Sequence, residues 1–543
     1  MVHVPLAHKI EVKQSLNVLQ QKFQTALNLH RQGKLSGAAK LCEEVIFYNS
    51  RHFGALHLLG VIYAQMLQFE RAVELISRAI RVDAKNVEAY YNRGTAFKEL
   101  KRYEHALADY EKAISLRHNY SDAYYNRGIV FLALFRFHDA LASNDKAITL
   151  KPDWAEAYNN RGMALKELKR LDEALASCDR AIELKPDYFE AYGNRGGLLK
   201  ELGRMDDALA NYDKAIALQP SYHRALWSRA SLLLLLGHFE HGLRQYEFRG
   251  SREGVLKYRR YYQPQLLDAE LLKGKTLLIC HELYFGDMIQ FCRYAILAEQ
   301  RGARVVISAQ NKLRDLLATL SPSIEIISEK TEPSSFDHYV PLMSLPLAFH
   351  TKLENIPANV PYLHSDAVRV SKWRSVIGVH GFKIGICWQG SKLSEDTDRS
   401  FPLAEFLHLS QLPNVRLISL QKYDGVEQLK ALPTGMKVET LGEEFDSGPQ
   451  AFLDTAAVMQ NLDLVITCDT AMAHLAGALA RPAWVVLKYV PDWRWLLNRD
   501  DSPWYPTLRL FRQDEPYYWR SAFEKMEAAI TDLLRNYRPN EIK

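Results

Sequence analysis

A 34-residue period in the first half of the chain constrains its fold more than any other feature. The segments YYNRG, YYNRG, YNNRG and YGNRG end on glycines at positions 94, 128, 162 and 196. A second block such as ALADYEKAISL starts twelve residues after the glycine, and prolines 152, 186 and 220 end three of these blocks. Small and apolar residues recur at steps of three and four, which predicts two amphipathic helices per unit. Such units bury their apolar faces by stacking into a superhelix.

The period and its Gly, Ala and Pro positions resemble the tetratricopeptide repeat. The resemblance covers residues 17–250, about seven repeats, and implies a superhelix whose first helices line a concave face. The arginine of each NRG segment is interpreted as a packing and ion-pairing residue rather than an anion site.

Each of four units carries an asparagine at the same place in its first helix. They are Asn92, Asn126, Asn160 and Asn194. A side-chain amide has two donors and an acceptor, so a ladder of amides can pair with an extended peptide backbone regardless of its sequence. The position is similar to the peptide-holding ladder of the protein O-GlcNAc transferase superhelix. The alternative is that these asparagines were duplicated with their repeat and only solvate the inner face, and both interpretations stay open.

Length and composition exclude several classes of protein. A chain of 543 residues is too long for one domain, and 69 basic against 64 acidic residues, without a long basic run, argues against nucleic acid as a partner. No apolar run is long enough for a signal peptide or a transmembrane segment. The six cysteines are scattered singly, so neither a zinc site nor a disulfide framework is predicted. We therefore expect a cytoplasmic protein.

The second half alternates strand and helix patterns. Strands are predicted in KTLLICHE, RVVISAQ, IEIIS, FKIGICWQG, VRLISLQ, LDLVITCDT and AWVVLKY, with helices in DMIQFCRYAILAEQRG and NKLRDLLATL. A Pro-rich passage, YVPLMSLPLAFHTKLENIPANVPYL, interrupts the alternation. The pattern predicts an α/β fold of two doubly wound, Rossmann-like lobes with parallel sheets. The expected domains are an N-terminal extension (1–16), the superhelix (17–250), a linker (251–273), a first lobe (274–375), a second lobe (376–520) and a C-terminal helix (521–543).

Polar residues gather in four loops at predicted strand ends, where open parallel sheets bind ligands. These candidate site residues are Asp287, Lys392, Arg399, Gln421, Glu427, Asp469, Thr470 and His474. The last three surround the start of a small-residue helix, AMAHLAGALA, and a helix N-terminus favours an anion such as a diphosphate. Each signal also has an ordinary explanation: an Asp-Thr pair before a helix is commonly an N-cap, and a helical histidine is commonly buried and satisfied.

Five motifs in residues 275–520 resemble the heptosyltransferase-type glycosyltransferases of GT-B architecture, and more closely their bacterial relatives fused to tetratricopeptide repeats. The motifs are GDMIQFCRYA, DRSF, SLQ, DTAMAHLAGALARPAWVVL and PDWRWLLNRDDSPWYPTLRLFRQ. The resemblance implies an inverting, metal-independent transfer from a nucleotide-diphosphate sugar, with no further cofactor. The first lobe would bind the acceptor and supply Asp287 as general base. In the second lobe Asp469, Thr470, His474 and Lys392 would hold the diphosphate together with Arg399, and Gln421 and Glu427 would complete the nucleotide-sugar site.

One loop departs from the pattern of these relatives. They carry Glu-Gln-Gly-Leu-Gly-Asp before the first helix, whereas this chain has HELYFGD, with Leu283, Tyr284 and Phe285 in place of small residues. Glycine allows a close backbone approach to a ligand, and the larger side chains would crowd it. Two functions therefore remain: a glycosyltransferase whose repeats recruit a protein acceptor, or a non-catalytic scaffold with a degenerate glycosyltransferase-like domain.

Overall fold

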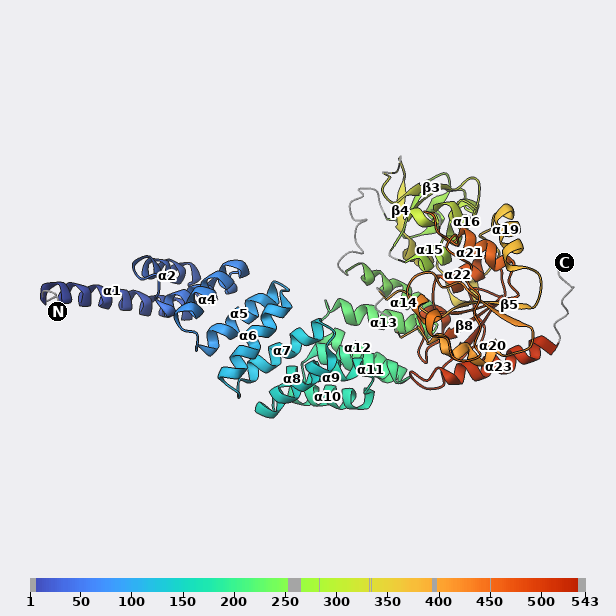
Figure 1. Ribbon diagram of the computed structural model, residues 1–543. Helices are drawn as coiled ribbons and strands as arrows, with labels where there is room; N and C mark the ends of the chain where they lie inside the picture. Colours follow the sequence, from blue (N-terminus) through green and yellow to red (C-terminus); the bar gives the residue numbers. More distant parts are fainter. Residues whose placement is uncertain are drawn as a thin grey trace. The chain divides into compact units, whose positions relative to one another are not determined.

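The chain forms two compact units, residues 1–198 and 199–543. The computed structural model describes residues 6–251, 265–282, 284–331, 333, 335–392, 398–449 and 451–535 (Figure 1). The boundary between the units falls inside the predicted superhelix, so the last repeats belong to the same unit as the two sheets. Most of the predicted linker, residues 252–264, lies outside the described residues. Among the described helices, none combines the length and the apolar character needed to cross a membrane.

The first unit is built from successive helices, and each of the first nine packs against the one that follows. These are α1 (Leu6–Arg31), α2 (Leu35–Tyr48), α3 (Phe53–Gln65), α4 (Phe69–Val82), α5 (Val87–Glu99), α6 (Tyr103–Leu116), α7 (Ser121–Ala133), α8 (Phe137–Leu150), α9 (Ala155–Glu167), α10 (Leu171–Leu184) and α11 (Phe189–Glu201), which crosses into the second unit. The two-helix repeat predicted from the sequence is confirmed. Helix α1 begins at Leu6, inside the segment that was expected to be an extension.

The turn inside every repeat has the same backbone conformation. A residue with positive φ recurs every 34 residues: Gly33, Leu67, Lys101, Phe135, Lys169, Gly203 and Gly237. Four of these seven are not glycine, although the left-handed region costs an L-residue roughly 1–2 kcal/mol. The stacking of the repeats therefore holds these turns in a strained conformation.

Small residues and arginines hold each repeat together. A Cβ at Gly94 would lie 3.0 Å from the ring of Tyr110, and one at Gly162 would lie 3.0 Å from Cys178 Sγ, so glycine permits the close helix contact. The NRG arginines hydrogen-bond side chains 16 residues away in the chain, as in Arg93 with Asp109 at 2.7 Å. Their predicted packing and ion-pairing role is confirmed.

The second unit begins with the last helices of the repeat array. These are α12 (Met205–Leu218), α13 (His223–Leu235), α14 (Phe239–Tyr246) and the short helix η1 (Glu247–Ser251). Phe239 and Tyr246 pack their rings against Trp493, and Phe239 also contacts Trp504. The end of the array is thus part of the hydrophobic core of the second unit.

The first lobe contains a four-stranded parallel sheet of order β3-β2-β1-β4. Its strands are β1 (Thr276–Cys280), β2 (Arg304–Ala309), β3 (Glu325–Ser328) and β4 (His338–Pro341). Its helices are η3 (Ala269–Leu272), α15 (Phe285–Phe291), α16 (Arg293–Gln300), η4 (Asn311–Leu313), α17 (Arg314–Leu317), η5 (Leu342–Ser344), α18 (Leu345–Ala348) and η6 (Leu353–Asn355). The helix predicted over 287–302 is therefore two helices that meet at Cys292.

The second lobe contains a five-stranded parallel sheet of order β6-β5-β7-β8-β9. Its strands are β5 (Phe382–Cys387), β6 (Val415–Ser419), β7 (Leu464–Cys468), β8 (Ala483–Leu487) and β9 (Leu508–Arg512). Its helices are α19 (Ala367–Ile377), η7 (Leu403–Phe406), α20 (Leu407–Ser410), η8 (Val426–Ala431), α21 (Leu453–Gln460), α22 (Ala471–Ala478), η9 (Trp493–Trp495) and α23 (Arg520–Arg535). The α/β fold with two parallel sheets is confirmed.

Two edge strands were missed by the sequence analysis. Strand β4 lies in the passage interpreted as a Pro-rich interruption, and its last residue, Pro341, pairs with Cys280. Proline is tolerated there because β4 is an edge strand, where one row of backbone groups has no strand partner. Strand β9 lies in the motif that ends LRLFRQ. Its arginines alternate with apolar residues, so the segment lacks the continuous apolar run of a buried strand.

Candidate active site between the two sheets

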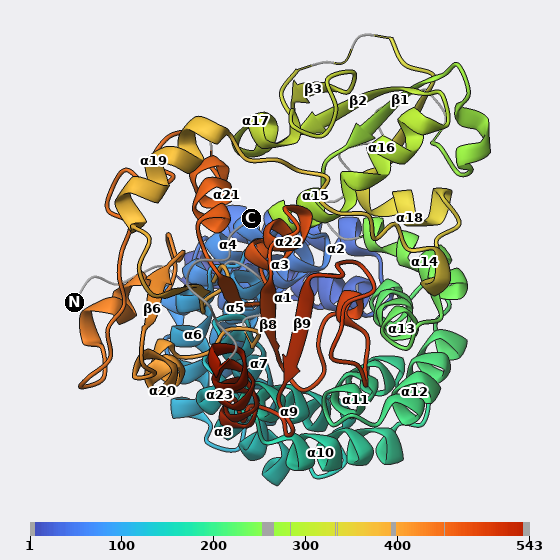
Figure 2. The same ribbon diagram turned by 90° about the vertical axis from the view of Figure 1, so that its right-hand side faces the viewer.

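Two helices meet at their N-termini where the lobes join (Figure 2). Helix α15 follows β1 of the first sheet, and α22 follows β7 of the second. A Cβ at Gly286 would lie 3.0 Å from Cδ2 of His474 and 3.6 Å from Cα of Ala471. Gly286 therefore allows the loop of the first lobe to approach the second lobe closely, and the carboxyl ends of both sheets share one region.

Asp287 forms an ion pair across this junction. Nη2 of Arg494 donates a 2.6 Å hydrogen bond to Oδ1 of Asp287, and Nη1 of Arg494 donates to Oδ1 of Asp492 at 2.7 Å. The side chain of Asp287 is 17% exposed. Burial raises the pKa of Asp287 to about 6, although Arg494 opposes that rise. The predicted base thus has a pKa suited to proton transfer near neutral pH.

Arg494 and Asp492 are functional candidates that the sequence analysis missed. They lie in the PDWRW segment, which was noted as a family motif but given no role. Burial opposes ionisation of Asp492, but Arg494 outweighs it and holds the pKa of Asp492 below its usual value. A charged pair within an aromatic-rich motif was the available signal, because buried charges are rare unless they are paired.

Asp469 and Arg399 belong to the same cluster of charges. Burial and the negative charge of Asp492 raise the pKa of Asp469, while Arg399 lowers it. Nε of Arg399 is buried, and within the described part of the chain it has no hydrogen-bond partner. Asp287 thus bonds Arg494, and the charges of Arg494 and Arg399 both act on Asp469.

His474 is buried among aromatic side chains at this junction. Its ring stacks on Trp495 with centroids 5.4 Å apart, and its Nδ1 is 3.1 Å from the hydroxyl of Tyr505. Burial, together with the charge of Arg494, holds the pKa of His474 well below its usual value, so the imidazole is neutral. These contacts favour a supporting role and argue against the direct diphosphate contact expected from the sequence.

Thr470 and Gln421 hold the loops at the ends of three adjoining strands. Thr470 is the N-cap of α22, and its hydroxyl accepts from Met472 N at 3.3 Å. Oε1 of Gln421 accepts from the backbone N–H of Trp388 and of Gln389, both at 3.1 Å. Both side chains therefore shape the donor-side loops, and the N-cap explanation holds for Thr470.

Lys392 and Glu427 form a pair on the surface. Nζ of Lys392 donates to Oε1 of Glu427 at 3.0 Å, and both side chains are 58% exposed. Exposed pairs contribute little to stability, so neither residue is needed for the fold. Both are available for a ligand once the pair opens.

The loop that departs from the family pattern lies against the second lobe. Phe285 contacts Phe452 edge to face, with centroids 5.7 Å apart, and Tyr284 is 49% exposed. Leu283 lies outside the described residues. The aromatic residue at 285 therefore closes the loop onto the second lobe, where relatives have flexible residues.

The four asparagines of the repeats hydrogen-bond within the first unit. Each contacts the residue 35 positions earlier: Asn92 with His57, Asn126 with Tyr91, Asn160 with Tyr125 and Asn194 with Asn159. Asn126 also accepts from Nζ of Lys98 at 3.1 Å. These amides link neighbouring repeats, and their binding of a peptide stays a prediction.

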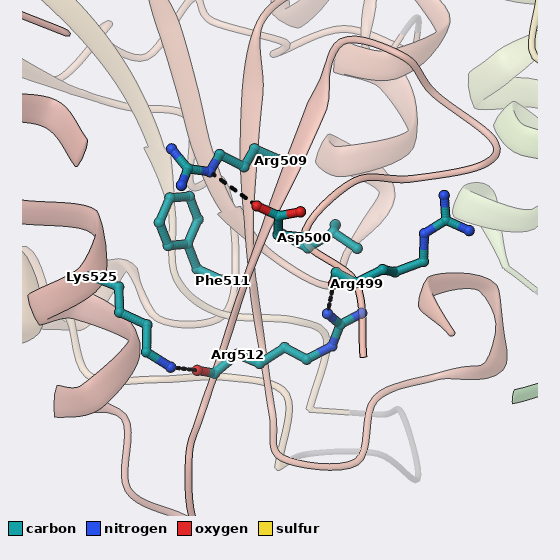
Figure 3. Close-up of a pocket in the computed structure, with 7 residues that line it drawn as sticks. Arg499, Asp500, Arg509, Phe511, Arg512 and Lys525 are labelled. Carbon is teal, nitrogen blue, oxygen red and sulfur yellow. Dashed lines mark hydrogen bonds and ion pairs between the residues drawn. The ribbon is translucent and has the colours of Figure 1, made fainter. Parts of the chain in front are cut away.

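A hollow of about 300 Å³ lies elsewhere, beside the edge strand β9 (Figure 3). It is lined by Arg499, Asp500, Arg509, Leu510, Phe511, Arg512 and Lys525, and by none of the candidate site residues. Within the residues that the structure describes, no group of three His, Cys, Asp or Glu side chains is arranged to hold a metal ion.

The chain combines tetratricopeptide repeats with a domain of the glycosyltransferase family 9 (heptosyltransferase). Tetratricopeptide-repeat families match residues 53–86, 87–120, 155–188 and 189–222. The glycosyltransferase family 9 matches residues 363–487, a range that contains every donor-side candidate but not Asp287. The resemblance noted from the motifs is confirmed, and the domain supports glycosyl transfer.

Several proteins are similar to parts of this chain. Protein FlbA of Caulobacter vibrioides is 24% identical over 314 residues, and the match covers 52% of each chain, so this chain spans about half of that relative. Among solved structures, YrrB, described as a TPR protein with an unusual peptide-binding site, is 27% identical, with a TM-score of 0.31 over 35% of this chain and 98% of YrrB. A tetratricopeptide repeat protein from Parabacteroides merdae is 19% identical, with a TM-score of 0.38 over 44% of this chain and 94% of that one.

Proposed function

We propose that the second unit transfers a sugar from a nucleotide-diphosphate donor to a hydroxyl acceptor, with inversion and without a metal or further cofactor. The observation that carries the proposal is the hydrogen bond from Arg494 of the second lobe to Asp287 of the first, together with the charges of Arg399 and Arg494 that act on Asp469. A carboxylate whose pKa is raised to about 6 can accept a proton at neutral pH and sits at the lobe junction.

Each step of the transfer has a residue to perform it. Asp287 accepts the proton of the acceptor hydroxyl as its oxygen attacks the anomeric carbon from the face opposite the leaving group. The bond between the anomeric carbon and the diphosphate oxygen breaks, and the diphosphate leaves with the electron pair. Arg399 and the N-terminus of α22, which begins at Ala471, would stabilise that charge. Lys392, Glu427 and the Gln421 loop would bind the nucleotide.

Donor binding can be tested without knowing the acceptor. UDP, GDP, ADP and CDP, with their sugar forms, are screened for a rise in melting temperature. A ligand at 100 times its Kd stabilises the folded state by about 2.7 kcal/mol. Arg399→Met should remove the rise for the true donor.

The role of Asp287 is tested by turnover of that donor. Asp287→Asn should lower release of the nucleoside diphosphate by about 10²–10⁴-fold and leave the melting-temperature rise intact, since the acid belongs to the other lobe. Asp315→Asn, an exposed acid of the same lobe, is the matched control. Equal loss of donor binding and turnover in Asp287→Asn would mean that Asp287 is structural.

A second function is favoured by two observations. Asp287 is already engaged in a buried ion pair with Arg494, and Phe285 packs the neighbouring loop against the second lobe. A scaffold with a degenerate domain would show these contacts too. Failure of every nucleotide to raise the melting temperature would support the scaffold over the enzyme.

The acceptor we propose is a protein segment held by the repeats. The asparagine ladder supplies amides at a constant step, and such amides can bind a backbone with little sequence preference. The hydroxyl that reacts would be that of a serine or threonine. A small saccharide or lipid that serves equally well as acceptor would overturn this part of the proposal.

A further inference from the structure

A buried arginine at the end of the last repeat contacts the loop that carries Asp287. Arg249 lies in η1, directly after α14, and is 8% exposed. Its Nε and Nη2 donate to the two carboxylate oxygens of Glu282 at 3.0 and 3.2 Å. A bidentate pair of this kind fixes the orientation of the carboxylate as well as its position.

Glu282 is the second residue of HELYFGD and lies between β1 and Asp287. It is 8% exposed, and its Oε2 also accepts from Met343 N at 2.6 Å. Its backbone carbonyl accepts from Nε2 of Gln310 at 2.9 Å. The beginning of the loop is therefore held from several sides, and the cation that pairs with Glu282 comes from the repeat array.

Further contacts from the array surround Arg249. Glu247 accepts from Nη1 of Arg249 at 2.7 Å and from the hydroxyl of Ser344. Nη2 of Arg249 also donates to Ser344 at 2.8 Å. The ring of Tyr246 lies 5.3 Å from the guanidinium and packs against Trp493, the neighbour of Arg494. The last repeat thus touches both segments that hold Asp287.

We propose that Arg249 is a positioning residue of the active site, and that the last repeat is a fixed part of the catalytic unit rather than a detachable recruiting arm. The proposal rests on the proposed function for the role of Asp287. Through Glu282, Arg249 sets where the loop leaves β1 and therefore where Asp287 meets Arg494. An unpaired, buried Glu282 would move toward water and take the loop with it.

Hydrogen–deuterium exchange of the full chain tests the loop directly. Arg249→Met should speed exchange in residues 281–291 by about tenfold or more, because the local opening becomes easier. The matched control is Arg229→Met, which removes a repeat arginine that contacts Asp213 and Gln245 instead. That control should leave residues 281–291 unchanged. Unchanged exchange there in Arg249→Met would overturn the proposal.

If Arg249→Met does not fold, Glu282→Gln alone should speed exchange in residues 281–291, because the amide loses the charge-assisted pair with Arg249, and unchanged exchange would overturn the proposal. Where Arg249→Met folds, the two changes are combined. The neutral amide removes the need for a cation, so adding Arg249→Met to Glu282→Gln should speed exchange less than Arg249→Met does in the native background. Equal effects in both backgrounds would mean that the pair does not hold the loop.

Turnover measurements distinguish a positioning role of Arg249 from a role that only supports the fold. Arg249→Met should lower release of nucleoside diphosphate by about tenfold or more, while the melting-temperature rise caused by the donor nucleotide stays the same. Equal loss of both would mean that Arg249 only supports the fold. If the native chain turns over none of the donors, the proposed function fails, and the exchange comparison still decides whether Arg249 holds the loop.

Discussion

Arginines in the two compact units make contacts of different range. In the first unit, each NRG arginine bonds a side chain 16 residues away, in the second helix of its own repeat or of the preceding repeat. In the second unit, Arg249, Arg293 and Arg494 are buried and join segments 33, 211 and 207 residues apart in sequence. The first unit repeats one local bond, whereas the second depends on a few bonds that are each made once.

This difference predicts how the stability of each unit responds to the loss of one contact. The stability of a repeat array is close to a sum of repeat and nearest-neighbour contributions, so one lost contact is felt locally. A buried arginine that joins distant segments leaves unsatisfied groups on every one of them when it is removed. Five predictions test this comparison, from the largest expected effect to the smallest.

Arg293→Met should destabilise the second unit by about 3 kcal/mol or more, because hydrogen bonds to a charged group contribute roughly 1.5–3 kcal/mol each. Arg293 donates to the carbonyl oxygens of Pro357 and Trp504 and to the hydroxyl of Tyr362 at 2.7–2.8 Å. Arg127→Met in the first unit should cost about 1 kcal/mol. Urea unfolding followed by near-ultraviolet and far-ultraviolet circular dichroism compares the two. Equal losses would contradict the comparison.

The pH dependence of donor turnover tests the contact of Arg494 with Asp287. Asp287 must be ionised to act as base, so kcat/KM should fall about tenfold per pH unit below pH 6. Arg494→Met removes the charge that lowers the pKa of Asp287, so the inflection should move to higher pH. The neighbours Glu282 and Asp492 raise that pKa, and Arg249 still lowers it. An unmoved inflection would place Arg494 outside the reaction.

Ionisation of Asp287 is required for turnover but lowers the stability of the second unit. The pKa of Asp287 is higher in the folded chain than the ordinary value of 3.8, so folding favours its protonated form. The stabilisation is complete below about pH 4 and is lost as the pH rises through about 6. The second unit should therefore gain stability from Asp287→Asn at pH 7, while turnover is lost. A fall in melting temperature would show that the ion pair with Arg494 outweighs burial.

Substitution of the asparagines tests whether side chains that bond within the first unit also bind a protein acceptor. Asn126→Ala should destabilise the array by about 1 kcal/mol, since it loses its bonds to Tyr91 and Asp122. With Asn160→Ala, it should also raise the KM for a protein acceptor and leave hydrolysis of the sugar nucleotide unchanged. Tyr91→Phe removes the bond but keeps the amide, so it should lower stability without changing that KM. If Tyr91→Phe changes the KM as much, the ladder only links repeats.

The smallest effect is expected at the turns with positive φ. Lys101→Gly should stabilise the first unit by about 0.5–1 kcal/mol, because relief of the left-handed strain exceeds the entropy cost of glycine. Leu496→Gly in the second unit relieves the same strain at φ 53°, but its side chain is 5% exposed, so the lost burial should give net destabilisation. Thermal unfolding of both variants measures the difference in sign.

The difference between the units also explains what could be predicted from sequence. The repeats were predictable because each contact recurs with its period, and the NRG arginines carry their 16-residue partners with them. The core strands β1, β2, β5, β7 and β8 were predictable because buried parallel strands are continuous apolar runs. Edge strands β4 and β9 were missed because prolines and charges break that pattern.

The candidate site was predicted only in part. Asp287, Asp469 and Arg399 follow strands, so the rule that ligands bind at strand ends placed them together. Arg494 and Arg249 carry no such signal, because contacts across 207 and 33 residues leave no period in the sequence. The contacts of His474 with Trp495 and Tyr505 could not be predicted, since both aromatic residues come from a different loop.

The seven turns with positive φ are places where the array can gain or lose a whole 34-residue repeat. A duplication or deletion of 34 residues between Leu67 and Lys169 would join one strained turn to an equivalent one and leave each helix pair with an equivalent neighbour. No such freedom exists beyond residue 199, where Phe239, Tyr246 and Arg249 are each fitted to one particular partner. Repeat number is therefore a property that related chains can vary at one end of the array, while the other end is fixed by the lobes.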